Sequence, residues 1–401
     1  MVLFTGKGGV GKTSIAAATA VTAAQRGNRV LITSTDAAHS LADAFASPLG
    51  DRPTPVERAD GLRLYAQQLD AQQRLERHWG QVREYLTALL SWGGVDHVAA
   101  EEIVLLPGLD ELFALIDLRA QVATGRYDLI VVDCAPTAET LKLLTLPDAL
   151  RFYSDRVRTP GRAVARAIAP LARPRGAGGN GFPLPDDGVL DAATQLHDQL
   201  AGVHALLTDT DRSSVRLVVN PERIVLAEAE RTATSLSLFG YGIDAVVVNR
   251  ILPDHVADPY LRRWQQRHAE HLRSARAAFA PTPVLEVPLL EDEVVGFAAL
   301  CELGAATYDD RDPVEVLHRH HPIEVIVDGE DALLRLHLPF AVEDDLALSR
   351  RGDTLQVTVG GLRRNVPLPA TMLRRTVTGA RLTEGCLEVR FATEPVGVVG
   401  P

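Results

Sequence analysis

The residues best suited to do chemistry lie close to the start of the sequence. Gly6-Lys7-Gly8-Gly9-Val10-Gly11-Lys12-Thr13 has four residues between its first and last framing glycines, followed by a lysine and a hydroxyl side chain. Glycines let backbone N–H groups turn inward around phosphate oxygens, and a helix that begins near Lys12 adds the positive end of its dipole. In this pattern Lys12 reaches the β- and γ-phosphates, and Thr13 ligates Mg²⁺. The predicted nucleotide contacts are Gly6, Gly8, Gly9, Val10, Gly11, Lys12, Thr13 and Ser14.

The segments around this loop predict a strand, a loop and a helix. Residues 2–5 form a short apolar run, and residues 14–25 are rich in alanine and end before Gly27. Further buried strands are predicted from apolar runs at 29–34, 62–67, 128–133, 215–219, 244–248 and 284–287. Helical segments lie between these runs. Strands that alternate with helices over roughly 300 residues predict a doubly wound α/β fold with a mostly parallel sheet.

Two helical insertions interrupt this alternation, at about 71–123 and 146–207. They either cover the sheet or form a separate helical subdomain. We therefore predict that one α/β domain with these two insertions spans residues 1–309.

The pattern changes after Asp309. Residues 310–322 are charged and histidine-rich, which predicts a linker with few contacts between two domains. Beyond it, short strands are predicted at 323–327, 333–338, 355–359, 363–366 and 387–391. Apolar and polar residues alternate along them, as in half-buried antiparallel strands. A small antiparallel β-sandwich is therefore predicted over 323–392, with a tail at 393–401.

Composition limits the partners and the compartment. The net charge of −11 argues against binding to nucleic acid. Cys134, Cys301 and Cys386 are far apart in the sequence, which excludes a CxxC zinc site and suits a reducing cytoplasm. Charges interrupt every apolar stretch before the roughly 18 residues that a membrane helix needs. A cytoplasmic protein without a membrane span is expected.

Lys7 adds a second lysine inside the phosphate loop. This arrangement resembles the deviant Walker A signature of a subclass of P-loop ATPases that work as dimers. The resemblance implies a homodimer in which Lys7 crosses the interface to the partner's nucleotide, much as an arginine finger would.

Four further segments narrow the resemblance to the ArsA family, which includes arsenite-pump ATPases and targeting factors for tail-anchored membrane proteins. Residues 34–45 (STDAAHSLADAF) resemble its switch I, and residues 133–144 (DCAPTAETLKLL) resemble its switch II. Residues 107–111 (PGLDE) and 247–250 (VVNR) are similar to other signatures of the family. The likeness covers roughly residues 1–309, with the segments in the family's order.

The resemblance implies roles for individual residues, with ATP and Mg²⁺ as cofactors. Asp36 resembles the switch I aspartate that orients the attacking water, so Asp36, Lys7 and Lys12 form the expected catalytic set. Asp133 resembles the aspartate that holds Mg²⁺ through its water shell. Asn249 is expected to read the adenine edge, and Pro288 and Leu289 to cover the ring.

The sequence also departs from the family pattern. Ala37 and Ala138 replace the usual switch I proline and switch II glycine, and alanine tolerates positive φ poorly. The zinc CxxC of the eukaryotic targeting dimer and the metalloid-binding cysteines of arsenite pumps have no counterpart. With only Met1 and Met372, the chain also lacks the methionines of a soft helix-binding groove.

The C-terminal region resembles the α-crystallin domain of small heat-shock proteins. Its most specific element is A-x-x-x-x-G-x-L at residues 380–387, and residues 334–339, 352–355 and 366–369 support it. The resemblance implies binding of exposed strands and hydrophobic segments along sheet edges. An inert appendage or a dimerisation module remains an alternative.

Two weaker features have two interpretations each. His318-Arg319-His320-His321 is either a metal site or, more in keeping with its surroundings, a solvated linker. Residues 151–175 interleave arginines with apolar residues, which fits a helix packed on its own domain better than a membrane or client surface.

The function predicted from the sequence is Mg²⁺-dependent ATP hydrolysis by a homodimer, coupled to binding or targeting of a hydrophobic client. One alternative is an ATPase subunit that energises an anion efflux pump in the membrane. Another is a partition or positioning ATPase, which would need a basic DNA-binding face or a C-terminal membrane helix. A nitrogenase-reductase-like role would need two cysteines near the switches, and only Cys134 is there.

Overall fold

The computed structural model describes residues 1–35, 40–56, 61–68, 109–134, 187–329 and 331–393. Its larger sheet has the strand order β3-β4-β2-β5-β1-β6-β7-β8 within these residues. All neighbouring strands pair in parallel except β3 and β4. The strands are β1 (Val2–Thr5), β2 (Val30–Ser34), β3 (Thr54–Pro55), β4 (Leu64–Gln68), β5 (Leu129–Asp133), β6 (Ser214–Val219), β7 (Ile243–Ile251) and β8 (Val284–Pro288). The predicted doubly wound, mostly parallel sheet is confirmed.

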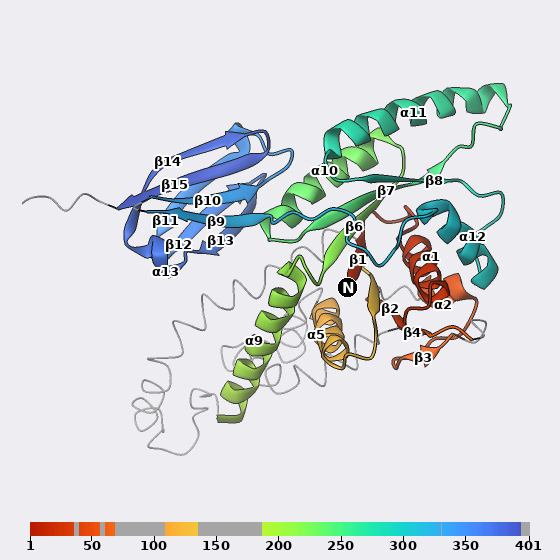
Figure 1. Cartoon of the computed structure of the whole chain (residues 1–401), viewed down its shortest axis with the longest axis horizontal. Coiled ribbons are helices and arrows are strands. Elements are labelled where there is room, and N and C mark those ends of the chain that lie inside the picture. Colours follow the sequence, from red (N-terminus) through yellow and green to blue (C-terminus); the bar gives the residue numbers. More distant parts are fainter. Residues whose placement is uncertain (36–39, 57–60, 69–108, 135–186, 330, 394–401) are drawn as a thin grey trace, which may run out of the picture.

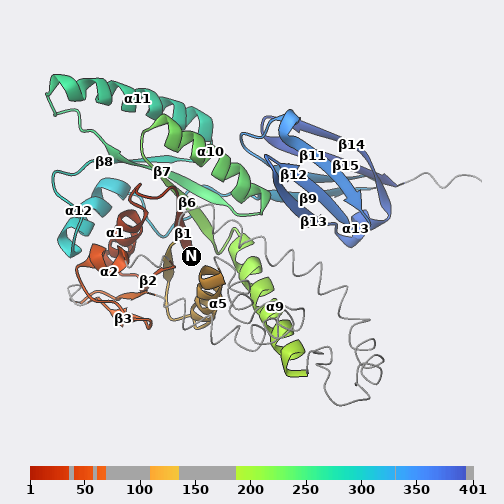
Figure 2. The ribbon, with the colours of Figure 1, turned by 180° about the vertical axis from the view of Figure 1, so that it is seen from behind.

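Helices cover both faces of this sheet (Figures 1 and 2). On one face α1 (Lys12–Gln25) packs with α2 (Ser40–Phe45) and α12 (Phe297–Tyr308). On the other, α5 (Leu109–Ala123) packs with α9 (Asp187–Thr208), while α10 (Arg223–Leu238) and α11 (Pro259–Phe279) lie along β6, β7 and β8. Strands β1, β2, β5 and β6 are therefore buried along their whole length. None of the described helices has the length and apolarity to span a bilayer.

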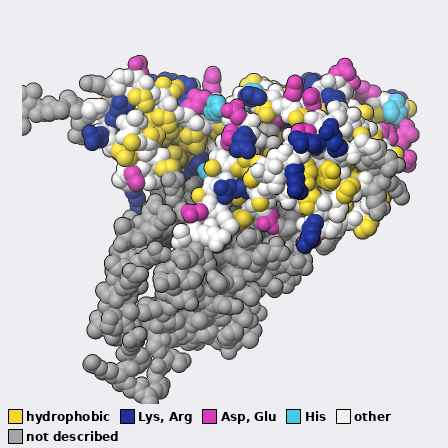
Figure 3. Space-filling model, turned by 60° about the horizontal axis from the view of Figure 1, so that its bottom comes forward, with side chains coloured by type: hydrophobic (Ala, Val, Ile, Leu, Met, Phe, Trp, Pro, Cys, Tyr) yellow, Lys and Arg dark blue, Asp and Glu magenta, His cyan; other side chains and the backbone are white. Residues whose placement is uncertain are grey.

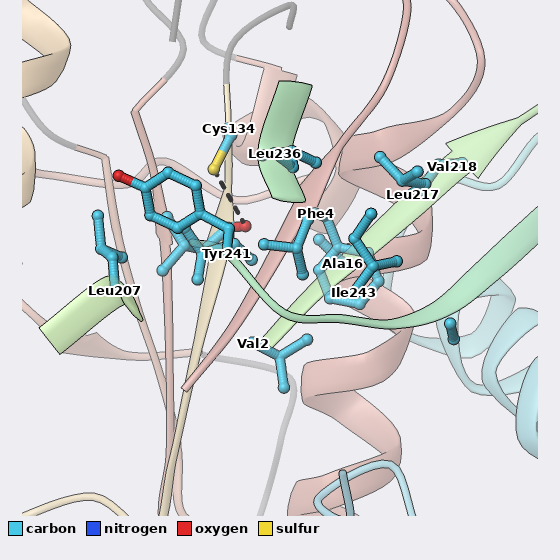
Figure 4. Packing of buried hydrophobic residues seen from close by; sticks show 14 of the residues in the cluster. Val2, Phe4, Ala16, Cys134, Leu207, Leu217, Val218, Leu236, Tyr241 and Ile243 are labelled. Atoms are coloured by element: carbon cyan, nitrogen blue, oxygen red, sulfur yellow. Dashed lines mark hydrogen bonds between the residues drawn. The ribbon is translucent and has the colours of Figure 1, made fainter. Parts of the chain in front are cut away.

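One hydrophobic core joins these elements. Phe4 of β1, Ala16 of α1 and Leu236 of α10 belong to it, together with side chains from α9, β6 and β7 (Figure 4). Leu118 of α5 and Leu200 of α9 belong to the same core. The described parts of the two predicted insertions thus cover the sheet. The remainder of both insertions, including 151–175, lies outside the described residues.

The C-terminal region forms two antiparallel sheets, which confirms the predicted β-sandwich. The first has the order β14-β15-β10-β9 and the second the order β11-β12-β13. Their strands are β9 (Ile323–Asp328), β10 (Asp331–His337), β11 (Leu346–Arg351), β12 (Thr354–Val359), β13 (Leu362–Pro367), β14 (Arg375–Thr383) and β15 (Cys386–Thr393). A short 3₁₀ helix (Glu343–Asp345) and α13 (Ala370–Leu373) connect them. Strands β11 and β14 were not among the predicted strands, because few of their side chains are apolar and buried.

The charged segment before the sandwich does not separate it from the parallel sheet, so the prediction of few contacts is wrong. Arg216 of β6, which is fully buried, donates from Nη2 to the carbonyl of Glu315 at 2.9 Å. The hydroxyl of Thr210 lies 2.9 Å from Nδ1 of His321. The ring of His320 stacks on that of His318 and is partly buried, so this segment is not a solvated linker. Polar groups at and before the start of β6 therefore hold residues 315–321 against the parallel sheet.

The sandwich itself also contacts the α/β region beside α10 (Figures 1 and 2). Arg364 of β13 is buried, donates to the carbonyl of Leu238 at the end of α10, and lies over the ring of Phe239. Phe279 of α11 meets Phe340 edge to face, with ring centroids 5.2 Å apart. A guanidinium at a helix C-terminus satisfies carbonyls that the helix leaves unpaired. Both contacts fix the sandwich to the α/β region.

Candidate nucleotide-binding site

The loop between β1 and α1 lies at the carboxyl edge of the parallel strands, where α/β proteins bind ligands. Two of its glycines are required by close approaches. A Cβ on Gly6, at φ 154°, would lie 2.2 Å from the carbonyl oxygen of Val218 on β6. A Cβ on Gly11, at φ 91°, would lie 2.4 Å from Nδ2 of Asn249. A larger residue at position 6 would push the loop off the backbone of β6, and one at position 11 would displace the Asn249 side chain and strain the backbone.

The backbone of this loop is arranged for an anion. Among the described residues, none accepts a hydrogen bond from the backbone amides of residues 8–14. Helix α1 begins at Lys12, as predicted for the phosphate loop, so its positive end faces the same loop. Lys12 is 7% exposed, and its ammonium donates to the carbonyl of Lys7 at 3.3 Å. Phosphate oxygens would provide the acceptors that these groups need.

Thr13 and Asp133, the two predicted magnesium residues, lie side by side. The Thr13 hydroxyl donates to Oδ2 of Asp133 at 2.8 Å, and Ser34 Oγ lies 3.4 Å from the same oxygen. The Ser34 contact arises because β2 and β5 are neighbours and end in register, with Ser34 opposite Asp133, whereas Thr13 reaches Asp133 from the first turn of α1, which packs on β5. Asp133 is 1% exposed. Hydroxyl and carboxylate oxygens are the ligands that Mg²⁺ prefers, so this donor set fits the metal.

Asn249 and Arg250 support the phosphate loop from β7. Asn249 donates from Nδ2 to the carbonyl of Val10 at 2.9 Å, and its Oδ1 accepts from the amide of Arg250 at 2.9 Å. Arg250 donates from Nη1 to the carbonyl of Gly9 at 3.0 Å. Its φ of 61° is uncommon for a residue other than glycine. The sequence motif predicted a role for Asn249 in nucleotide binding, but it did not predict that Arg250 hydrogen-bonds to the phosphate loop.

The end of β8 and helix α11 both bind the backbone at the end of β7. The amide of Leu289 donates to the carbonyl of Ile251 at 2.7 Å, which places Pro288 and Leu289 beside the end of β7. His268 of α11 accepts the amide of Leu252 on Nδ1 at 3.2 Å. Burial and the nearby His271 lower the pKa of His268, in keeping with an unprotonated acceptor nitrogen. Of the predicted adenine residues, Asn249 contacts the phosphate loop, and Pro288 and Leu289 lie beside the end of the same strand β7; their contact with a base stays a prediction.

The predicted catalytic residues are not all gathered at one point. The ammonium of Lys12 donates to the carbonyl of Lys7 within the loop. The ammonium of Lys7 instead lies 3.3 Å from Oε2 of Glu228 on α10. Asp36 lies outside the described residues, but the preceding Thr35 donates its amide to the carbonyl of Asp133 at 3.0 Å. Glu228 had no signal in the sequence, because only the packing of α10 brings it to Lys7.

A family model described as an anion-transporting ATPase matches residues 1–309. The chain belongs to the ArsA family of ATPases. A second model, described as an HSP20-like domain found in ArsA, matches residues 329–391, so the ATPase region and the sandwich occur together in this family. Its members hydrolyse ATP, and the loop between β1 and α1 carries the sequence pattern that predicts the nucleotide site.

Relatives of this ATPase are similar over about three quarters of the chain or more. A putative arsenical pump-driving ATPase of Prosthecochloris vibrioformis is 34% identical and covers 99% of this chain and 97% of its own length. A putative arsenical pump-driving ATPase of Aquifex aeolicus is 33% identical, covering 92% of this chain and 94% of its own. An ATPase ASNA1 homolog of Trypanosoma cruzi is 28% identical over 74% of this chain and 87% of its own.

Proposed function

We propose that this ArsA-family ATPase acts with Mg²⁺ as a homodimer in the cytoplasm, and that its nucleotide state controls the binding of a hydrophobic, membrane-protein-like client. The observation that carries the catalytic part is the pair formed by Thr13 and Asp133 beside the phosphate loop. That pair brings a metal-binding hydroxyl and a buried carboxylate to the amides of residues 8–14. The arrangement supports phosphoryl transfer to water.

Each residue of the site then has a specific task. Lys12 and the loop amides hold the β- and γ-phosphates, and Arg250 and Asn249 keep the loop in shape. Thr13 would bind Mg²⁺ directly and Asp133 would hold it through its water shell, and the metal would neutralise charge that develops on the phosphate oxygens. Asp36 orients the attacking water. Asn249 also reads adenine, for which its amide must give up or share its bond to Val10.

The client part of the proposal is supported by the exposed strands of the sandwich. Val325, Ile326 and Val327 of β9 and Val377 of β14 are all exposed. Within the described residues β9 pairs only with β10, and β14 only with β15, so both strands present an open edge. Such edges pair with extended hydrophobic segments. The similarity to an ATPase named as an ASNA1 homolog also favours this class of function.

A second candidate function is that of an ATPase subunit that energises an anion efflux pump. The names of the Prosthecochloris vibrioformis and Aquifex aeolicus relatives, which match over 99% and 92% of this chain, favour it. The metalloid cysteines are missing, which counts against arsenite but not against every anion. A positioning ATPase has less support, since the described residues after α12 form a sandwich rather than a membrane helix.

Mixing two inactive variants tests the dimeric mechanism. Lys7→Ala lacks the residue that acts across the interface, and Asp36→Asn lacks the residue that positions water while it keeps ATP bound. A mixed dimer holds one site with both residues intact, so mixing should restore part of the ATPase activity. No activity at any ratio, with mixed dimers shown by tandem affinity tags, would contradict the proposal.

Capture of partners separates the client from the pump. The Asp36→Asn variant, purified with ATP bound, should retain proteins that carry a hydrophobic membrane segment, whereas wild type with ADP should not. An integral membrane transporter retained in stoichiometric amount, with no such clients, would favour the pump instead.

A further inference from the structure

The ion pair between Lys7 and Glu228 places the lysine on its own subunit. The two charged groups lie 3.3 Å apart, and their side chains are 43% and 35% exposed. A lysine that serves a partner's nucleotide must extend away from its own subunit. The Lys7 ammonium cannot pair with Glu228 and reach the partner's nucleotide at the same time. The observed ion pair therefore belongs to a resting state.

The fold determines this position of Lys7. Gly6 touches the end of β6, at the carbonyl of Val218, and α10 follows β6 after a short turn. Lys7 and Glu228 line a cavity of about 10 Å³ together with residues of β6 and α10, which leaves room for no more than about one water molecule. The lysine side chain is therefore laid against the first turns of α10.

The phosphate loop links this contact to the nucleotide. Lys12 donates to the carbonyl of Lys7, which ties the two lysines together in the resting loop. Phosphate oxygens compete for the Lys12 ammonium, since a charge-assisted bond to phosphate is stronger than one to a carbonyl. ATP binding thus removes the Lys12 contact that helps to hold the Lys7 segment.

We infer that Glu228 is a positioning residue that retains Lys7 in the resting subunit and releases it when the ATP-bound dimer forms. This inference rests on the proposed dimeric function of Lys7. The flexible four-carbon stem of lysine allows the exchange of one oxygen partner for another. An exposed ion pair contributes little energy, so its loss should change the dimerisation equilibrium by about twofold to fivefold.

The test compares Glu228→Gln with Glu230→Gln. Both substitutions remove one negative charge from α10, but only Glu228 pairs with Lys7 among the described residues. ATPase activity is measured against protein concentration, and dimerisation with ATP by sedimentation equilibrium. For Glu228→Gln the concentration at half-maximal activity should fall by about twofold to fivefold with an unchanged plateau, and Glu230→Gln should match wild type. High salt should remove the difference between Glu228→Gln and wild type.

Other outcomes would overturn the inference in distinct ways. An unchanged midpoint for Glu228→Gln means that the pair does not restrain Lys7. A lower plateau means that Glu228 works inside the active dimer. Glu228→Asp, which keeps the charge, should behave like wild type and serves as the second variant if Glu228→Gln fails to fold; a midpoint as low as the one expected for Glu228→Gln would also count against the ion pair. Failed complementation between Lys7→Ala and Asp36→Asn, by contrast, would refute the proposed function itself.

Discussion

The parallel sheet and the sandwich bury their strands in different ways. Strands β1, β2, β5 and β6 are buried on both faces because helices cover the sheet. In the sandwich, β9 is exposed over its last four residues and β14 over nearly its whole length. Figure 3 shows hydrophobic side chains gathered on the sandwich at the left of that view. Helices on both faces fix the strands of the parallel sheet and the loops at their ends, whereas the edge strands β9 and β14 of the sandwich remain largely exposed.

The comparison also shows where the two regions depend on each other. The Arg216–Asp244 ion pair, with a distance of 3.1 Å and both side chains fully buried, lies between β6 and β7. Arg216 also donates to the hydroxyl of Tyr308 at 3.0 Å, and that hydroxyl lies 2.6 Å from Oγ1 of Thr19 on α1. One polar network thus connects the helix of the phosphate loop with the segment that leads to the sandwich.

The largest effect on stability is expected from breaking this network. Arg216→Met leaves Asp244 charged and unpaired in the core, which should lower the free energy of unfolding by about 3–5 kcal/mol. Urea unfolding checks this. The double variant Arg216→Met/Asp244→Leu removes both charges and should recover most of the loss. A single variant as stable as wild type would mean that the pair adds nothing to the core.

A matched substitution in the two kinds of strand sharpens the comparison. Ile32 of β2 is 0% exposed, whereas Ile326 of β9 is 41% exposed. Ile32→Ala should cost about 2–5 kcal/mol, because it leaves a cavity in the core. Ile326→Ala should cost less than about 1 kcal/mol, since it removes surface that is already half in water. Equal losses in urea unfolding would show that β9 is covered in solution.

Removal of the residues after Asp309 tests whether the α/β region hydrolyses ATP by itself and the sandwich serves client binding. ATP turnover should stay within about threefold of wild type in a folded dimer, because the phosphate loop, Thr13 and Asp133 all precede the cut. Capture of an extended hydrophobic peptide should weaken. Both are measured at equal protein concentration, with folding of the shortened chain checked by circular dichroism. Loss of ATPase activity would place the sandwich in the catalytic machinery, and two unchanged activities would make it an inert appendage.

The last effect concerns pH at the junction of the two regions. Burial, followed by the neighbouring His337 and His318, lowers the pKa of His320 from the usual 6.5 to about 4. Burial also lowers the pKa of His337. Between pH 6.5 and about 4, His320 binds a proton in the unfolded chain but not in the folded chain. The contribution to stability is therefore present above pH 6.5 and is lost as the pH falls toward 4.

Urea unfolding at pH 7 and at pH 5 measures this dependence. The midpoint of wild type should fall on acidification by more than that of His320→Gln, which cannot take up the proton. A difference between the two pH values that is identical in both proteins would exclude His320 as its source.

Much of the ATPase region could be predicted from sequence because its signals are local. Short apolar runs predicted β1, β2, β5, β6, β7 and β8 to within a few residues, and the spacing of Gly6, Gly11 and Lys12 indicated the phosphate loop. The sandwich was harder. Its half-buried strands β10 and β12 show alternation, but β11 and β14 have too few buried apolar residues to be recognised. Asp36 itself lies outside the described residues, so its predicted role is untested.

The sequence by itself determined the parallel fold, the phosphate loop and the residue types of the site. Periodicity and glycine spacing act over a few residues, so they are visible in a single chain. Only the tertiary structure decided which residues support that loop. The bonds from Asn249 and Arg250 to its carbonyls and the ion pair of Lys7 with Glu228 join positions more than 200 residues apart. Such contacts arise from strand order and helix packing, which bring together side chains that no local pattern relates.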